Sequence, residues 1–212
     1  MFTSPQRRQR GLSLIELVMF MVIMGVAAVT VLQLLNISTK ASAEPVRRKQ
    51  ALLLAEALME EVQQARFTFC DPSDINAATA TSAATGASGD TTKCDATVEN
   101  FGPENGEKRP YNNVNDYVTT YGMAQESFLN AAGNQLVDAA DQPMGGQPPL
   151  TGFTATVSME PATLGPAGMT VTGGTTPVNM EALRITIKVD YGNGNDVTLD
   201  GYRTRYAPRT AD

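Results

Sequence analysis

The chain has 212 residues, a formal net charge of −6, and neither histidine nor tryptophan. Without histidine it lacks the commonest general base and metal ligand, and its acidic balance argues against a nucleic-acid-binding surface. Its two cysteines, Cys70 and Cys94, do not form a CxxC pair, so the sequence contains no metal-binding cysteine motif.

Residues 12–35 form an apolar run that contains one charged residue, Glu16. A run of about 20 apolar residues is long enough to cross a bilayer as a helix. The next charge downstream is Lys40, whereas the residues before the run include a basic cluster, Arg7, Arg8 and Arg10. The positive-inside rule therefore predicts a cytoplasmic N-terminus and a translocated C-terminal part.

Three interpretations of this segment are open. A secretory signal peptide would be cut at the A-x-A pattern of residues 41–43, although the apolar run exceeds the usual length of about 7–15 residues. In a plain signal anchor, Glu16 would lie near the membrane interface or complement the start of the helix. In the third interpretation, cleavage after Gly11 exposes the amine of Leu12. The charge of Glu16 is costly in the membrane, and the corresponding amine of a neighbouring subunit compensates it.

The stretch RGLSLIELVMFMVIMGVAAVTVL, residues 10–32, resembles the prepilin signature of type IV pilins and type II secretion pseudopilins. The resemblance implies that a prepilin peptidase removes a leader ending at Gly11 and that Leu12 is then N-methylated. It also implies that Glu16 acts in filament assembly. Leucine at the first mature position departs from the commoner phenylalanine or methionine.

The residues after the apolar run predict a second half of the helix, up to residue 67. Pro45 lies in a polar stretch and predicts a kink or short break there. Apolar residues then recur at helical spacing, namely Ala51, Leu54, Ala55, Leu58 and Val62. Because Glu56, Glu60 and Gln63 take the opposite side, we expect the apolar stripe to pack on the protein's own sheet, with part of it contacting neighbouring subunits.

Residues 68–150 are predicted to be a connecting loop region, because small and polar residues dominate there, above all in residues 76–94. In an oxidising compartment a disulfide between Cys70 and Cys94 would close this loop at its base. Three residues near Cys70 offer oxygen ligands suited to calcium: Asp71, Asp74 and Asn76. They lack the EF-hand pattern and are interpreted as turn residues, so we expect no metal site.

Further along, YNNVNDYVTTY (111–121) indicates a short helix that anchors the loop on the core through one face, formed by Tyr111, Val114, Tyr117 and Tyr121. This segment, together with residues 67–80 and 102–110, resembles minor pilins of the mannose-sensitive haemagglutinin (MSHA) pilus, in particular its D-type subunits.

Period-two alternation predicts three strands, at residues 153–160, 181–191 and 196–206. Residues 165–179 would form a loop between the first two, GNGN at 192–195 a hairpin turn, and Gly201 a bulge. Each strand has one apolar and one polar face, which favours an antiparallel sheet covered on one side. The predicted fold class is therefore α+β and pilin-like, with a long N-terminal helix packed on an antiparallel β-sheet and a long disulfide-closed loop between them.

The predicted organisation is a leader (1–11), a transmembrane helix half (12–35), an amphipathic helix half (36–67), the loop region (68–150) and the sheet region (151–212). We find no catalytic constellation, so the chain is not predicted to be an enzyme, and no cofactor is expected.

The resemblance implies a minor subunit of an MSHA-like type IV pilus; a minor type II secretion pseudopilin and a pilus-tip adhesion subunit are the alternatives. The implied partners are a prepilin peptidase/N-methyltransferase, other major and minor pilins, an inner-membrane assembly platform and the lipid bilayer. The implied location is the inner membrane, single-pass with a periplasmic C-terminus, and then the filament. Loss of residues 1–11 leaves 13 basic against 22 acidic residues, which argues against nucleic acid as a partner.

Overall fold

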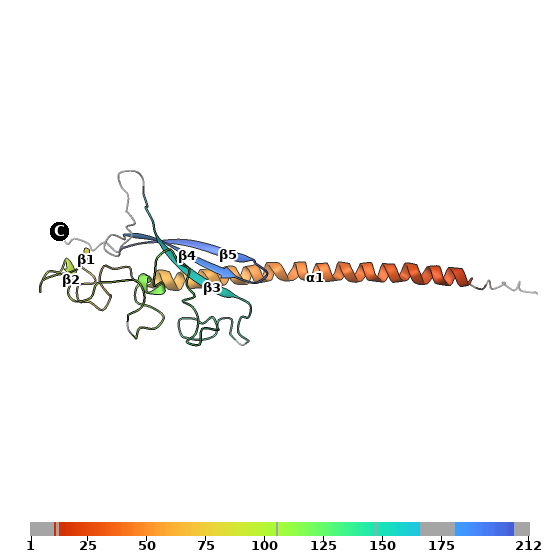
Figure 1. Ribbon diagram of the computed structural model, residues 1–212, viewed down its shortest axis with the longest axis horizontal. Helices are drawn as coiled ribbons and strands as arrows, with labels where there is room; N and C mark the ends of the chain where they lie inside the picture. Colours follow the sequence, from red (N-terminus) through yellow and green to blue (C-terminus); the bar gives the residue numbers. More distant parts are fainter. Residues whose placement is uncertain (1–10, 12, 105, 147, 166–180, 206–212) are drawn as a thin grey trace, which may run out of the picture. The chain divides into compact units, whose positions relative to one another are not determined.

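The computed structural model describes residue 11 and residues 13–104, 106–146, 148–165 and 181–205. The predicted basic cluster (Arg7, Arg8 and Arg10), Leu12 and nearly all of the predicted loop at 165–179 lie outside the described residues. The elements, labelled in Figure 1, are α1 (Leu14–Gln64), β1 (Ser82–Thr85), β2 (Lys93–Cys94), η1 (Val114–Tyr117), β3 (Thr154–Pro161), β4 (Ala182–Asp190) and β5 (Asp196–Thr204). The chain divides into two units, residues 1–46 and 47–212.

Helix α1 continues through Pro45, so the predicted short break is wrong, whereas a kink at this residue stays a prediction. Proline removes one backbone donor, but Pro45 is exposed, and water can bind the carbonyl oxygen that loses its partner. The helix ends at Gln64, where the N–H of Ala65 bonds to the carbonyl of Val62 at 3.3 Å in a tightened last turn.

In the first unit, α1 contains the apolar span Leu14–Ile37, which is long and apolar enough to cross a membrane. Every residue of this span is exposed. No described residue of this unit therefore covers the apolar surface of Leu14–Ile37.

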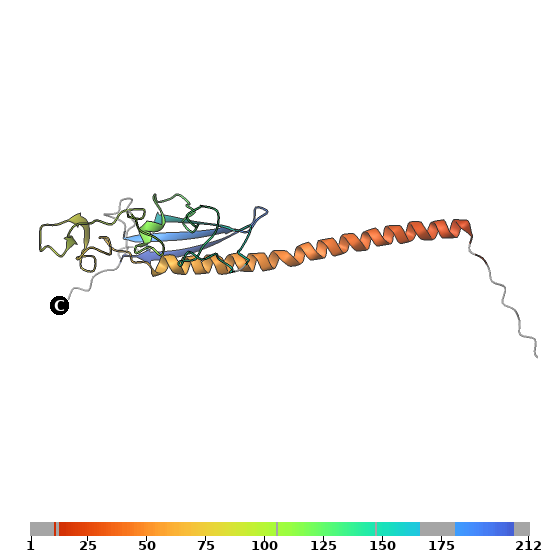
Figure 2. The ribbon, with the colours of Figure 1, turned by 90° about the horizontal axis from the view of Figure 1, so that it is seen from below.

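In the second unit, the C-terminal part of α1 lies along one face of the sheet (Figure 2). The predicted apolar stripe is confirmed: its members are at most 6% exposed, namely Ala51, Leu54, Ala55, Leu58 and Val62. They share one core with the inward residues of the sheet, among them Val157, Met159, Ile185 and Ile187. Burial of this stripe against the sheet is what stabilises the second unit.

The sheet has the order β3-β4-β5 and is antiparallel throughout, as predicted. Its register places Ile187 opposite Val157 on one side and opposite Leu199 on the other. The predicted hairpin turn is also present: the N–H of Tyr191 donates to the carbonyl of Asn195 at 3.0 Å. The helix on one face and the antiparallel sheet together form an α+β arrangement that fits a pilin-like fold in general terms.

Gly201 does not form the predicted bulge. It pairs with Ile185 in a register that has no shift along β4 and β5. A Cβ at this position would lie 2.5 Å from Nε2 of Gln63 and 2.8 Å from Sδ of Met59, both on α1. The ends of two flexible side chains of α1 therefore fill the space that a side chain at residue 201 would take.

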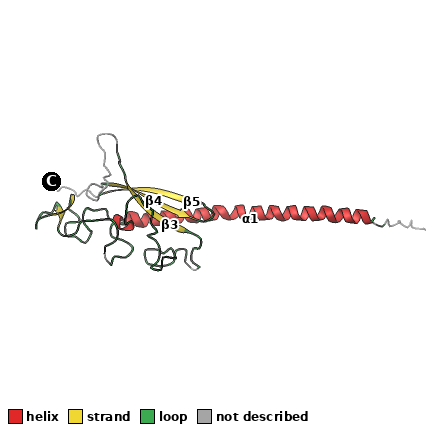
Figure 3. Ribbon diagram, in the orientation of Figure 1, coloured by secondary structure: helices red, strands yellow, loops and turns green. Residues whose placement is uncertain are grey.

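The region between α1 and β3 consists mostly of loops and turns (Figure 3). The predicted short helix is a single 3-10 turn, η1, capped by Asn113. Val114 and Tyr117 are buried and anchor the loop on the core as expected, but Tyr121 is 39% exposed. Because η1 ends after one turn, Tyr121 does not lie on the same helical face as Val114 and Tyr117.

Candidate functional site

The N-terminal segment places Glu16 in the first turn of α1. The carbonyl of Ser13 accepts the backbone N–H groups of Glu16 at 3.1 Å and Leu17 at 3.2 Å, which starts the helix. A carboxylate in the first turn complements the positive end of the helix dipole. Gly11 is exposed, with no atom within 4 Å of where a Cβ would stand, so its surroundings leave room for another molecule.

The apolar span that follows exposes large side chains on all sides. Leu14 is 82% exposed, Phe20 63% and Leu34 67%. The hydroxyl of Thr30 donates to the carbonyl of Ala27 at 2.8 Å, so this polar group is satisfied within the helix. Such a surface is suited to lipid or to the helices of other subunits.

The predicted disulfide between Cys70 and Cys94 is present, with 5.4 Å between the Cα atoms. It belongs to a small core with Ala77 and Ala80, separate from the main core. Strands β1 and β2 pair in parallel within the closed loop, a short sheet that the sequence did not predict. Residues 70–98, which we call the disulfide lobe, thus contain little apolar cover of their own and depend on the cross-link.

Asp74 confirms its interpretation as a turn residue, because its carboxylate binds the backbone of the disulfide lobe. It accepts four N–H groups at 2.9–3.2 Å, from Asn76, Asp95, Ala96 and Thr97. Partial burial raises the pKa of Asp74, but these donors outweigh it and lower the pKa to about 2. Asn76 has a similar role, since its side-chain amide donates to the carbonyl of Lys93 at 2.9 Å.

Glu61 of α1 holds the loop region to the helix. Its carboxylate receives two hydrogen bonds from Arg109, at 2.9 and 2.7 Å, and one from the hydroxyl of Tyr117 at 2.9 Å. Burial raises the pKa of Tyr117, and the charge of Glu61 raises it further. The side chains of Glu61 and Arg109 are only 11% and 9% exposed, so this is a buried, fully paired acid.

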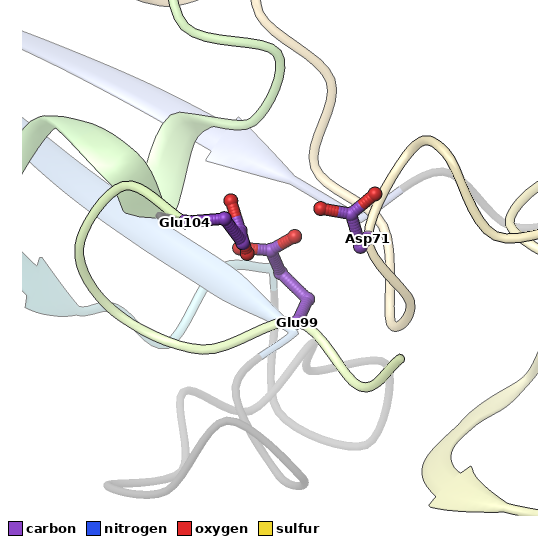
Figure 4. A group of neighbouring side chains, drawn as sticks. All are labelled: Asp71, Glu99 and Glu104. Atoms are coloured by element: carbon purple, nitrogen blue, oxygen red, sulfur yellow. The ribbon is translucent and has the colours of Figure 1, made fainter. Parts of the chain in front are cut away.

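A second group of acids gathers beside the disulfide lobe. Oxygens of Asp71, Glu99 and Glu104 lie within 4.8 Å of one another, and Figure 4 shows the carboxyl group of Asp71, from one segment, beside those of Glu99 and Glu104, from another. Glu104 also belongs to a second such triplet, with Glu107 and Asp116. Glu99 is 0% exposed, Asp71 4% and Asp116 2%. We call these five residues the acidic cluster.

Hydrogen bonding in the acidic cluster is incomplete. Glu107 accepts the N–H of Asn112 at 3.1 Å, and Asp116 accepts that of Asn113 at 2.9 Å. Among the described residues, both carboxyl oxygens of Glu99 are buried without a hydrogen-bond partner, as is one oxygen each of Glu104, Glu107 and Asp116. Buried acceptors without donors are rare and call for an explanation.

The pKa values of three acids in the acidic cluster are raised by burial and by their neighbouring carboxylates. Burial, and then the charges of Asp116, Glu104 and Asp71, raise the pKa of Glu99 to about 9, with Arg205 opposing them. Burial also raises the pKa of Asp116 to about 8 and that of Glu104 to about 7, with neighbouring carboxylates adding to each. Mutual repulsion and burial therefore disfavour the ionised form at these sites.

Arg205 lies against the same region. Its guanidinium donates to the carbonyl of Thr68 and packs 4.4 and 4.3 Å from the ring centroids of Phe67 and Phe69. Burial lowers the pKa of Arg205 to about 10, although Glu99 and Glu181 oppose that change.

Sequence reasoning missed most of the acidic cluster. It considered Asp71 with Asp74 and Asn76, but the structure places Asp71 with acids that follow much later in the chain. The only signal was the density of acids between residues 99 and 116, which an ordinary acidic surface shares. Their spacing matches no metal-binding motif.

Comparison with known proteins identifies the N-terminal segment. Residues 6–32 match the family model of the prokaryotic N-terminal methylation motif. The N-terminal segment therefore carries a prepilin-type methylation motif, and this motif implies a structural subunit that a prepilin peptidase processes and that assembles with other pilins. The matched range includes Gly11, Leu12 and Glu16, whose individual roles stay predictions. No curated protein and no solved structure matches the chain.

Proposed function

We propose that the protein is a minor subunit of an MSHA-like type IV pilus, cleaved after Gly11 and methylated on Leu12. Before assembly it spans the inner membrane once, with the basic cluster before Gly11 in the cytoplasm and the C-terminal unit in the periplasm. An assembly platform in that membrane then adds it to the filament. The disulfide between Cys70 and Cys94 supports this orientation, because disulfides persist in oxidising compartments.

One observation carries the proposal: within a methylation motif, an exposed apolar helix begins with an acid in its first turn. No described residue of its unit covers the span Leu14–Ile37, and Glu16 lies in its first turn. A carboxylate in lipid costs about 2.5–3.5 kcal/mol at the centre of a helix, a cost that pairing with an amine reduces. In a bundle of such helices, cleavage gives each subunit a free N-terminal amine. Glu16 of a neighbouring subunit can form an ion pair with this amine.

The choice of a pilus over a secretion pseudopilus depends on the resemblance of residues 67–80 and 102–121 to MSHA minor pilins. Deletion of the gene should reduce surface pili while leaving type II secretion of exoproteins at its normal level. The reverse result would assign the chain to the secretion machinery.

The assembly role is tested by Glu16→Ala. The variant should still be processed, so its intact mass should match a methylated chain that begins at Leu12. Its amount in sheared pili should fall at least about tenfold, because the helix loses the charge that sets its register against a neighbouring amine. Mass spectrometry of membrane and pilus fractions measures both quantities.

The matched control is Glu56→Ala, an exposed acid on the same helix. It should enter pili like the wild type, because its charge lies outside the membrane span. Normal incorporation of the Glu16→Ala chain would contradict the proposed role of Glu16, and retention of residues 1–11 in the wild type would contradict the proposed cleavage.

A further inference from the structure

Among the described residues, the carboxyl groups of Glu61 and Asp74 are fully paired, whereas that of Glu99 is not. Glu61 meets Arg109 and Tyr117, and Asp74 meets four backbone N–H groups. Glu99, in contrast, is fully buried and has no hydrogen-bond partner for either oxygen among the described residues. An acid that served only to stabilise the fold would be expected to have the donors that Glu61 and Asp74 have.

The oxygens of Glu99 point toward two other acids. Figure 4 shows the carboxyl groups of Asp71 and Glu104 on either side of it, and the three residues offer oxygens within 4.8 Å of one another. Two ligands on opposite sides of a Ca²⁺ ion, each at about 2.3–2.6 Å, are about 4.6–5.2 Å apart. A single ion of this size can therefore contact all three residues without a large rearrangement.

We propose that Asp71, Glu99 and Glu104 form a calcium-binding site that ties the disulfide lobe to the body of the second unit. The ligand set consists of carboxylate oxygens alone, which favours a hard cation over zinc or copper. Ca²⁺ is preferred to Mg²⁺ because it accepts irregular geometry and bidentate carboxylates, whereas Mg²⁺ requires a near-ideal octahedron and keeps its waters.

The second triplet supports this position for the ion. Glu107 and Asp116 each already accept a backbone N–H, so their charges attract a cation while part of their coordination capacity is used. Glu99 has both oxygens available and lies in the first triplet. The ion is therefore assigned to Asp71, Glu99 and Glu104, with Glu107 and Asp116 as neighbouring negative charges.

The site would join Asp71, in the disulfide lobe, to Glu99 and Glu104, which lie on the loop that follows the lobe. Asp71 follows Cys70 of the disulfide, and Glu99 follows Val98, which forms a β-bridge with Cys70. Glu104 belongs to the loop that leads toward η1, where Tyr117 binds Glu61 of α1. A bound ion would thus connect the lobe to the part of the chain that is anchored on the helix.

The test uses the full mature chain in detergent micelles, treated with a chelator and dialysed. Titration calorimetry with CaCl₂ should show one site per chain. At a Ca²⁺ concentration 100 times the Kd, the melting temperature should rise by about 5–10 °C. MgCl₂ should bind at least about tenfold more weakly.

Glu99→Gln and Asp71→Asn should each weaken Ca²⁺ binding by at least about tenfold, because each removes a charged ligand. The control is Asp95→Asn, an exposed acid next to Cys94 and outside both triplets, which should bind Ca²⁺ like the wild type. In the chelator, the Glu99→Gln chain should melt no lower than the wild type, which shows that it folds.

Three results would overturn the proposal. The first is a wild-type chain that gives neither binding heat nor a change in melting temperature with CaCl₂. The second is a Glu99→Gln chain that binds Ca²⁺ with wild-type affinity. The third is binding of MgCl₂ in preference to CaCl₂. None of these results would affect the proposed pilin function, which depends on the N-terminal segment.

Discussion

Two salt bridges of this protein differ in how far water reaches them. The pair Glu61–Arg109 is about nine-tenths buried, whereas in Glu160–Arg184 the side chains are 49% and 42% exposed. Removing one partner of a buried pair leaves an uncompensated charge, whereas an exposed pair contributes little because water screens it. The two pairs should therefore respond differently to the same chemical change.

We predict that Glu61→Gln lowers the free energy of unfolding by about 3 kcal/mol or more, because the charge of Arg109 stays buried without its counter-ion. Glu160→Gln should cost less than about 1 kcal/mol. Denaturant unfolding of the two purified variants measures both values. Equal costs would mean that the contacts of Glu61 do not anchor the loop region.

At the scale of elements, one helix has two kinds of surroundings. Its first part is apolar all round and exposed, whereas its second part is apolar only on the stripe that packs on the sheet. The close fit of that second part depends on Gly201, where the side chains of Met59 and Gln63 occupy the space of a Cβ. Helix and sheet are thus matched in shape at this point as well as in hydrophobicity.

We predict that Gly201→Val lowers the free energy of unfolding by about 1–3 kcal/mol, because the side chains of Met59 and Gln63 must leave the space that valine needs. The cost should be smaller in a chain that also carries Met59→Ala, which frees the contested space. A double-mutant cycle from thermal or urea unfolding gives the coupling between the two sites. Additive effects would show that residue 201 and Met59 do not compete for the same space.

For the molecule as a whole, the acidic cluster links stability to pH. Burial and the charges of Asp116, Glu104 and Asp71 raise the pKa of Glu99 from 4.5 to about 9, against the opposing charge of Arg205. Between those pH values the folded chain keeps a proton that the unfolded chain has released. The free energy of unfolding therefore falls as the pH rises through this range.

We predict that the chain in a chelator melts at a lower temperature at pH 9 than at pH 6. Histidine contributes nothing in this range, because the chain has none, whereas Asp116 and Glu104, whose pKa values burial raises to about 8 and about 7, add to the effect of Glu99. Glu99→Gln should reduce the slope. A melting temperature that stays level or rises between pH 6 and pH 9 in the wild type would contradict the prediction.

Regular patterns in the sequence predicted the regular parts of the fold. The stripe from Ala51 to Val62 and the alternation in β3, β4 and β5 each describe burial on one face, which is a local property of a helix or strand. Pro45 was misjudged because a single lost hydrogen bond at an exposed position does not end a long helix. Gly201 was misjudged because a local pattern cannot distinguish a bulge from close contact with another element.

The sequence by itself determined the apolar N-terminal helix, its methylation motif, the cysteines available for a disulfide and the strands of the sheet, because each depends on neighbouring residues or simple spacing. Only the tertiary structure decided which acids meet. Asp71, Glu99 and Glu104 come from loops without periodicity, and their paths are set by the disulfide, the bridge at Cys70 and the anchor at Tyr117. Long-range contacts bring them together, and no local pattern records such contacts.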